Sequence, residues 1–186
     1  MLAGGMSRRM GRDKLLLDVD GQTLLESAVA RFTDEFDEVF VSVADAGKYP
    51  EVTARRVVDI RVGAGPLSGL HAALATIPGD GIFLVAADLP HSSPAAAKRI
   101  IELCGDKEAC IIRLPDGKIE PLFGYYRKSL LWRCEDAIDS GDYRMSEIVL
   151  KADTMFIKPE ELGGLWNEKM IFNINFPEDY ESLHNA

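Results

Sequence analysis

Cysteine is scarce in this sequence, long apolar runs are missing, and positive charge is outnumbered. The three cysteines, Cys104, Cys110 and Cys134, show no Cys-x-x-Cys spacing, which favours reduced thiols in a cytoplasmic protein over a disulfide framework or a zinc site. No apolar run approaches the length of a membrane span, and the first residues lack the apolar core of a secretory signal. We therefore expect a cytoplasmic protein with no membrane partner.

The charge balance excludes a further class of partner. Asp and Glu number 30 against 21 Lys and Arg, which gives a net charge of −9 at pH 7. Such a balance argues against a general nucleic-acid-binding surface. The chain nevertheless concentrates arginines in its opening stretch, as a site for a small polyanion would require.

The opening stretch from Leu2 to Lys14 is rich in both glycine and basic residues. It reads Leu-Ala-Gly-Gly-Met-Ser-Arg-Arg-Met-Gly-Arg-Asp-Lys, and it matches neither Gly-x-x-x-x-Gly-Lys-Ser/Thr nor Gly-x-Gly-x-x-Gly. Glycines at positions 4 and 5 let backbone N–H groups approach an anion, and Arg8 and Lys14 add positive charge. The stretch therefore predicts a phosphate-binding loop, with a frayed basic chain end as the alternative.

Apolar strands alternate with amphipathic helices along the first half of the chain. Helices are predicted at residues 23–36, 66–77 and 94–103, and strands at residues 39–44, 56–60 and 82–87. This alternation predicts an α/β fold with a mostly parallel sheet and helices on both faces. Only two or three residues precede the opening loop, so we also expect a very short first strand.

The second half has a different pattern. Strands at 109–113 and 121–126 flank a Pro-Asp-Gly-Lys turn, which predicts an antiparallel hairpin. Helices are predicted at 129–139 and 146–151, strands at 155–157 and 172–175, and a final helix from Pro177. The expected sheet is therefore parallel in its first part and partly antiparallel in its second.

Several polar residues lie where the predicted parallel strands end. Asp59 follows the second strand, Asp88 follows the most apolar one, and Gly65 and Gly69 flank the start of a helix. Ligands bind outside the carboxyl ends of strands in such folds. Asp88 suits Mg²⁺, which takes one or two carboxylates together with substrate phosphates. The alternatives are an N-cap for Asp88, a common strand-end acid for Asp59 and an ordinary loop-to-helix entry for the glycines.

The opening stretch resembles the signature L-A-G-G-x-S-x-R-M-G-x-D-K of the molybdenum cofactor guanylyltransferases, the MobA proteins. Shorter matches support the resemblance at three other places, namely Gly65–Gly69 with G-P-L-x-G, Asp88 with C-D-x-P, and residues 172–179 with F-x-N-x-N-T-P-E-D. Ala87 and Phe176 depart from these patterns, and Ser42 stands where the family often has asparagine. Related cytidylyltransferases usually begin L-A-A-G, so Gly4 and Gly5 favour guanine.

The resemblance implies a three-layer, Rossmann-like fold of the nucleotide-diphospho-sugar-transferase type in a single domain, residues 1–186. Residues 1–105 would bind the nucleotide and residues 106–186 the acceptor. It also implies the roles of individual residues. Catalysis would use Lys14, Asp88 and Arg8, with Asp88 binding the metal. The nucleotide would contact Leu2, Ala3, Gly4, Gly5, Lys14, Asp59, Gly65, Gly69 and Asp88. The acceptor would contact Arg144, Asn173 and Asn175.

Three of these assignments have simpler alternatives from the residues alone. Lys14 could be a solvated lysine, Arg144 a surface arginine, and Asn173 and Asn175 strand-end amides that cap the last helix. His71 and His91 lack a partner motif and are not assigned a role.

The reaction that the resemblance implies is transfer of GMP from GTP to the terminal phosphate of molybdopterin, with Mg²⁺ as cofactor and release of pyrophosphate. Proteins of molybdenum cofactor biosynthesis, or molybdoenzymes, would be partners. Two other readings stay open. One is the same chemistry with CTP or with a sugar phosphate or another phosphate acceptor, and the other is a non-catalytic nucleotide-binding module. The oligomeric state does not follow from the sequence.

Overall fold

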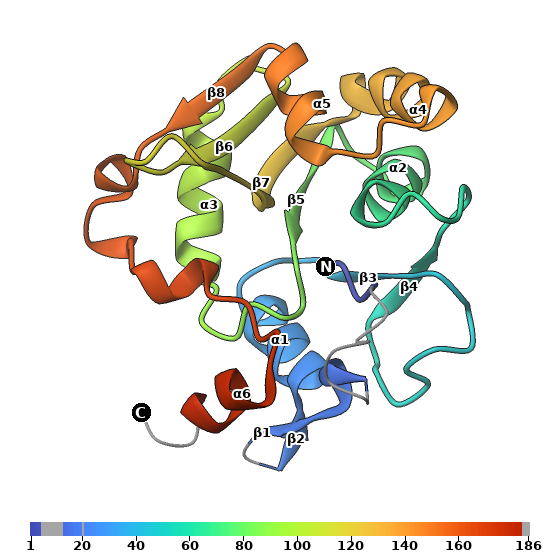
Figure 1. Cartoon of the computed structure of the whole chain (residues 1–186), viewed down its shortest axis with the longest axis vertical. Coiled ribbons are helices and arrows are strands. Elements are labelled where there is room, and N and C mark those ends of the chain that lie inside the picture. Colours follow the sequence, from blue (N-terminus) through green and yellow to red (C-terminus); the bar gives the residue numbers. More distant parts are fainter. Residues whose placement is uncertain (5–12, 20, 184–186) are drawn as a thin grey trace.

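The computed structural model describes residues 1–4, 13–19 and 21–183, and it shows an α/β protein with helices packed on both faces of a central sheet (Figure 1). This arrangement confirms the predicted fold class. No helix within the described residues is both long and apolar enough to cross a bilayer.

The strands form two main hydrogen-bonded groups and one small hairpin. Strands β3 (Phe40–Val43) and β4 (Arg55–Val58) pair in parallel. The second group has the order β5 (Gly81–Val85), β7 (Ile119–Arg127), β6 (Ala109–Arg113) and β8 (Thr154–Ile157). Strand β7 is antiparallel to β5 and β6, whereas β6 and β8 are parallel. The hairpin consists of β1 (Asp18–Val19) and β2 (Gln22–Thr23), which the sequence did not predict.

Residues 1–3 join the two groups into one sheet. Leu2 forms parallel bridges with Ser42 on β3 and with Ala86 just after β5. The Leu2 N–H donates to the Val85 carbonyl at 2.8 Å, and the Ala3 N–H donates to the Ser42 carbonyl at 3.0 Å. The expected short first strand is therefore confirmed, and it holds a central position between β3 and β5.

The first helices begin where their capping residues predict. Helix α1 (Leu24–Thr33) starts with a capping box, because the Glu26 N–H donates to Thr23 Oγ1 and the Thr23 N–H donates to Glu26 Oε2. It ends at Thr33, so the prediction that it continues to Phe36 is wrong at that end. Helix α2 (Pro66–Thr76) and helix α3 (Pro94–Leu103) both begin with proline in the first turn, as predicted.

The second half contains more short 3₁₀ turns than the sequence predicts. There, η2 (Lys128–Leu130) leads into helix α4 (Leu131–Ser140), whereas the first half has one such turn, η1 (Lys14–Leu16), before β1. Helix α5 (Met145–Lys151) is followed, after β8, by η3 (Pro159–Leu165) and η4 (Glu168–Ile171), and the chain ends in α6 (Pro177–Leu183).

The predicted strand at residues 172–175 is wrong. The segment is irregular and lies outside every strand of the described residues. The Ile174 N–H donates to the Asp88 carbonyl at 3.1 Å, and the Ile174 side chain is fully buried. The alternation of apolar and polar residues therefore reflects one anchoring side chain in a loop, not a sheet ladder.

The two faces of the sheet carry separate apolar cores. Helices α2, α4 and α5 cover one face, where Leu70, Ile111 and Val149 are among the buried residues. Helix α3 and the η3 turn cover the other, with Ile100, Phe123 and Leu162 in the core. The chain thus has the three layers expected of this fold class.

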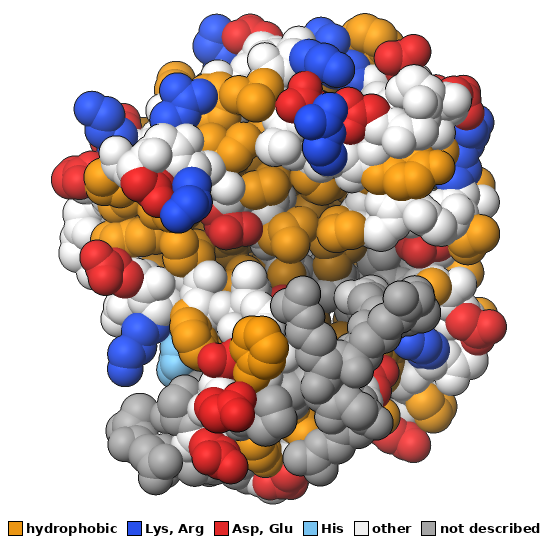
Figure 2. Space-filling model, viewed as in Figure 1, with side chains coloured by type: hydrophobic (Ala, Val, Ile, Leu, Met, Phe, Trp, Pro, Cys, Tyr) orange, Lys and Arg blue, Asp and Glu red, His pale blue; other side chains and the backbone are white. Residues whose placement is uncertain are grey.

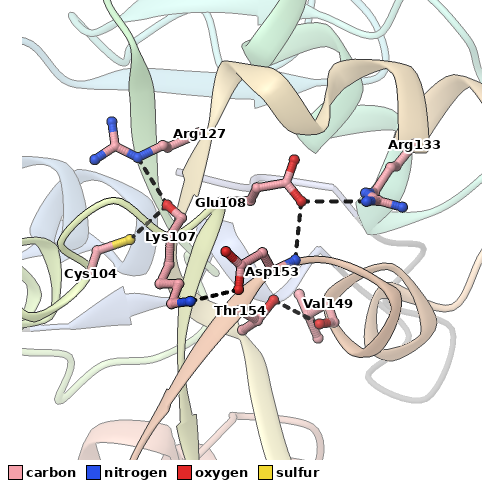
Figure 3. A network of polar contacts seen from close by, with 8 residues as sticks. All are labelled: Cys104, Lys107, Glu108, Arg127, Arg133, Val149, Asp153 and Thr154. Carbon is pink, nitrogen blue, oxygen red and sulfur yellow. Dashed lines mark hydrogen bonds and ion pairs between the residues drawn. The ribbon is translucent and has the colours of Figure 1, made fainter.

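A polar network fastens the sheet where β6 begins (Figure 3). Glu108 Oε2 accepts hydrogen bonds from Arg133 Nη2 at 3.5 Å and from the Asp153 N–H at 3.1 Å. Lys107 Nζ pairs with Asp153 Oδ1 at 2.9 Å, and Arg127 Nε donates to the Lys107 carbonyl at 2.9 Å. We call these residues the β6-start network, which links β6, β7, β8 and α4.

An apolar cavity of about 400 Å³ lies at the same edge of the sheet, between the starts of β3 and β5. Met1, Phe40 and Phe83 are among the residues that line it, but Lys14 and Asp88 are not. This cavity is therefore separate from the charged residues that the sequence singles out.

Candidate active site

Lys14 lies at the centre of a cluster assembled from three distant parts of the chain. Its Nζ atom is 2.5 Å from Asp88 Oδ2, 2.7 Å from the Ile174 carbonyl oxygen and 3.2 Å from Asn175 Oδ1. The side chains of Lys14 and Asp88 are 17% and 20% exposed. The structure therefore brings together three residues that the sequence assigned to the site, namely Lys14, Asp88 and Asn175.

The backbone of Lys14 is held by its neighbours. The Asp13 carboxylate caps the η1 turn by accepting the Leu15 N–H at 3.1 Å, and it also accepts the Tyr49 hydroxyl at 2.8 Å. Burial, with the adjacent Asp13 carboxylate, raises the pKa of Tyr49, so this hydroxyl stays a donor. The Leu15 side chain is buried. The Lys14 side chain thus extends toward Asp88 from a fixed base.

Asp88 is positioned by the end of the central sheet. The Ala87 N–H donates to the Leu2 carbonyl at 3.0 Å, which places Asp88 one residue beyond the last parallel pairing. The Asp88 carbonyl in turn accepts the Ile174 N–H. Asp88 therefore lies at the carboxyl end of the parallel strands, where α/β folds bind their ligands.

The oxygen atoms around the Lys14 ammonium are of the kind that magnesium prefers. A carboxylate, a main-chain carbonyl and an amide oxygen are all hard donors. Within the described residues, no three His, Cys, Asp or Glu side chains gather closely enough to hold a metal ion. The residues present thus fit a cation that takes few protein ligands and completes its shell with phosphate oxygens and water.

Asp59 lies at the end of β4, beside Ser42. Ser42 Oγ donates to Asp59 Oδ1 at 3.4 Å, and the Asp59 N–H donates to the Val43 carbonyl at 3.0 Å. Burial raises the pKa of Asp59, and the Ser42 hydrogen bond opposes that shift. Among the described residues the carboxylate therefore has one weak side-chain donor, and a ligand that offered N–H groups would find an acceptor here.

The loop before α2 is shaped by its glycines. Gly65 has φ +60° and ψ −135°, a conformation that disfavours residues with a side chain, and its carbonyl accepts the Ser68 N–H. Gly69 has a different role, because a Cβ atom there would lie 2.4 Å from Leu2 Cδ2 and 2.5 Å from Ser42 Oγ. The missing side chain at Gly69 allows α2 to pack directly on the central strands.

The opening loop is described only in part. Leu2 and Ala3 are buried, and their N–H groups already donate within the sheet, so these amides are not free to bind a phosphate. Gly4 is exposed directly after them. Gly5 and Arg8 lie outside the described residues, and their assigned roles remain predictions.

The two other residues assigned to the acceptor, Arg144 and Asn173, have surroundings of their own. Arg144 is 68% exposed and forms ion pairs with Asp142 and Glu147, and the Asp142 hydrogen bond raises its pKa. Asn173 has a buried Oδ1 atom with no hydrogen-bond partner among the described residues.

Sequence reasoning missed two groups near this site. One is the Ile174 carbonyl, which side-chain patterns cannot reveal. The other is Glu120, which precedes a bulge in β7 where the register against β6 shifts between Ile111 and Ile112. Burial raises the pKa of Glu120, and the negative charge of Asp88 raises it further. The sequence signal that could have revealed Glu120 was an acidic residue directly before Pro121 within an apolar strand.

Comparison with known proteins agrees with this geometry. A family model described as "MobA-like NTP transferase domain" matches residues 1–155. A "Probable molybdenum cofactor guanylyltransferase" of Thermococcus kodakarensis is 34% identical, over 98% of this chain and 92% of that protein. Its namesake in Methanosarcina mazei is 31% identical, over 98% of this chain and 88% of that protein.

A solved structure supports the fold independently. Molybdopterin-guanine dinucleotide biosynthesis protein A from Archaeoglobus fulgidus superposes with a TM-score of 0.86 at 24% identity, covering 99% of this chain and 95% of that one. The family match spans most of the sequence, and the relatives align over nearly their whole lengths. This chain therefore belongs to the MobA-like NTP transferase family and is a nucleotidyltransferase.

Proposed function

We propose that this protein transfers GMP from GTP to the terminal phosphate of molybdopterin. An oxygen of the acceptor phosphate forms the new bond to the α-phosphorus of GTP, and the bond from that phosphorus to the β-phosphate oxygen breaks. Pyrophosphate leaves with the electron pair, and the product is a guanine dinucleotide. The observation that carries this proposal is the cluster of Lys14, Asp88 and Asn175 at the carboxyl end of the parallel strands.

The chain's own residues supply positioning and charge. Lys14 offers an ammonium group to the phosphates, and Asp88, Asn175 and the Ile174 carbonyl provide the oxygens that would hold Mg²⁺. When bound, Mg²⁺ would neutralise charge on the phosphate oxygens. A phosphate monoester is already anionic at neutral pH, so the reaction needs no general base from the protein.

The two parts of the domain divide the substrates between them. We place the guanine near Gly65 and Asp59, where backbone groups and one weakly paired carboxylate are exposed to a ligand. We place the acceptor on the second half, residues 106–186. Figure 2 shows apolar side chains gathered over the region of β6 and β7, and Ile119 and Leu122 are half-buried there. Arg144 and Asn173 would contact the acceptor at the margin of this surface.

The test is transfer of radiolabel from [α-³²P]GTP to molybdopterin in the presence of Mg²⁺. We expect labelled dinucleotide and one pyrophosphate for each transfer, and neither with Asp88→Asn. A parallel reaction with CTP, and with a sugar phosphate as acceptor, tests specificity. GTP binding without pyrophosphate release would show a non-catalytic nucleotide-binding module instead, and preference for CTP would reject the guanylyl assignment. Proteins that receive the dinucleotide in cofactor biosynthesis are the partners we expect.

A further inference from the structure

The contacts of Lys14 describe a cation site that an amino group fills. Three oxygens from two segments converge on one nitrogen at 2.5, 2.7 and 3.2 Å. These are the donors that a hard divalent cation would use, at distances near 2.1 Å for Mg²⁺. An ammonium and a divalent cation cannot both occupy this position, because like charges only a few ångströms apart repel strongly.

We infer that Lys14 is a resident counter-ion that leaves its oxygens when a divalent cation binds. In the nucleotide-free protein its ammonium neutralises Asp88, and on metal binding the same ammonium is released toward the phosphates of the nucleotide. This inference rests on the proposed function in one respect, since it takes Asp88 to be a metal ligand. What it adds is competition between a lysine and the metal for the same oxygens.

The surrounding structure allows this exchange without rebuilding the site. The backbone that carries these oxygens is held independently of the ammonium, because the Asp88 carbonyl accepts the Ile174 N–H and the Asn175 N–H donates to Asp179 Oδ2 at 2.8 Å. The Lys14 backbone is fixed by the Asp13 cap, while the Lys14 ammonium is carried on a flexible four-carbon stem. Movement of one flexible side chain is therefore enough.

The exchange couples two binding events. Metal binding alone must displace the ammonium from its carboxylate, which weakens the apparent affinity for the metal. A polyanion near Lys14 gives the ammonium a new partner, so metal and polyanion strengthen each other's binding, as linkage requires. The competition should be visible without any nucleotide, since the ammonium and the metal use the same oxygens.

The test is Mn²⁺ binding to the nucleotide-free protein, followed by electron paramagnetic resonance. We expect Lys14→Met to bind Mn²⁺ at least about fivefold more tightly than the unmodified protein, the lower end of typical coupling. Lys14→Arg keeps a cation on the oxygens and should bind weakly. Lys48→Met is the matched control, because Lys48 is 4.0 Å from Asp13 and contacts none of the three oxygens. Asp88→Asn should abolish the binding.

Equal or weaker Mn²⁺ binding by Lys14→Met would overturn the inference. A second measurement needs no variant, because a ¹⁵N NMR titration with Mg²⁺ follows the lysine ammonium groups of the unmodified protein. The Lys14 signal should shift in proportion to Mg²⁺ bound, and saturation without any shift would also overturn the inference. Neither readout involves GTP. Failure of guanylyl transfer with an intact Mn²⁺ response would reject the proposed function alone.

Discussion

The two edges of the sheet both hold charged side chains, but they arrange them differently. At the carboxyl end of β5, the Lys14 ammonium contacts three oxygens, and the Lys14 side chain is only 17% exposed. In the β6-start network at the opposite edge, the charges form separate pairs, Lys107–Asp153 at 43% and 63% exposure and Arg133–Glu108 at 27% and 22% (Figure 3). We conclude that the first cluster is arranged for a ligand and the second for stability.

The largest loss of activity is expected from Asp88→Asn. The change removes the negative charge that would hold the metal, and we expect kcat to fall about 10³-fold, within the range for loss of a key electrostatic group. Its melting temperature should change little, because the amide oxygen of asparagine can still accept from Lys14 Nζ, which also keeps the Ile174 carbonyl and Asn175 Oδ1 as partners. Transfer kinetics and a thermal melt test this together. Near-normal turnover would refute the role of Asp88.

Lys14→Ala comes next. We expect kcat/KM for GTP to fall about 10²-fold, since one preorganised cation at the phosphates is lost while the metal oxygens remain. Steady-state kinetics measure the change, and Lys48→Ala serves as the control for a nearby lysine. A loss no larger than that of the control would leave Lys14 without a role in transfer.

Arg144→Ala should have a moderate and selective effect. The side chain is exposed and, in the part of the chain that the structure describes, pairs with local carboxylates, so its loss should raise KM for the acceptor by about tenfold at most and leave kcat unchanged. Initial rates of the variant, measured over a series of molybdopterin concentrations, give both KM and kcat. A loss as large as that of Lys14→Ala would show that the exposed pair belongs to the site after all.

Glu108→Gln tests the opposite edge. Loss of the carboxylate weakens the bonds from Arg133 and from the Asp153 N–H, which should cost about 1–2 kcal/mol of unfolding free energy. Calorimetry should show a melting temperature about 2–8 °C lower, with transfer rates unchanged. Altered transfer rates with an unchanged melting temperature would show that the β6-start network serves the reaction and not stability.

The smallest effect is expected from Glu120→Gln. Burial raises the pKa of Glu120 in the folded state above its unfolded value, so the folded protein holds the extra proton and loses stability as pH rises through that interval. The variant should therefore melt about 1–3 °C higher than the unmodified protein at pH 8 and equally at pH 4. Glu102→Gln, on an exposed side chain, is the matched control. A difference in melting temperature that is the same at pH 4 and pH 8 would contradict the raised pKa of Glu120.

Much of the fold followed from patterns that report local physics. Buried strands and their ends could be predicted because apolar runs stop where the sheet stops, which placed Asp59 and Asp88 correctly at one edge. The capping box at Thr23 fixed the start of α1. The very short strand at residues 1–3 was expected, and Leu2 confirms it through its two bridges.

The rest depends on contacts that side-chain patterns do not encode. The 172–175 segment mimics a strand because Ile174 is buried between two polar residues, but its N–H bonds to the Asp88 carbonyl. The Ile174 carbonyl reaches Lys14 only once that loop is in place. The β7 bulge beside Glu120 requires the pairing of β6 and β7 to shift, which no single strand predicts.

The most direct test of the central claim is a crystal structure with Mn²⁺ and a non-hydrolysable GTP analogue. The account predicts anomalous density about 2.1 Å from Asp88 Oδ2, with Lys14 Nζ on a phosphate oxygen and the base near Gly65. Nucleotide density elsewhere, with the Lys14–Asp88 pair still intact, would contradict it.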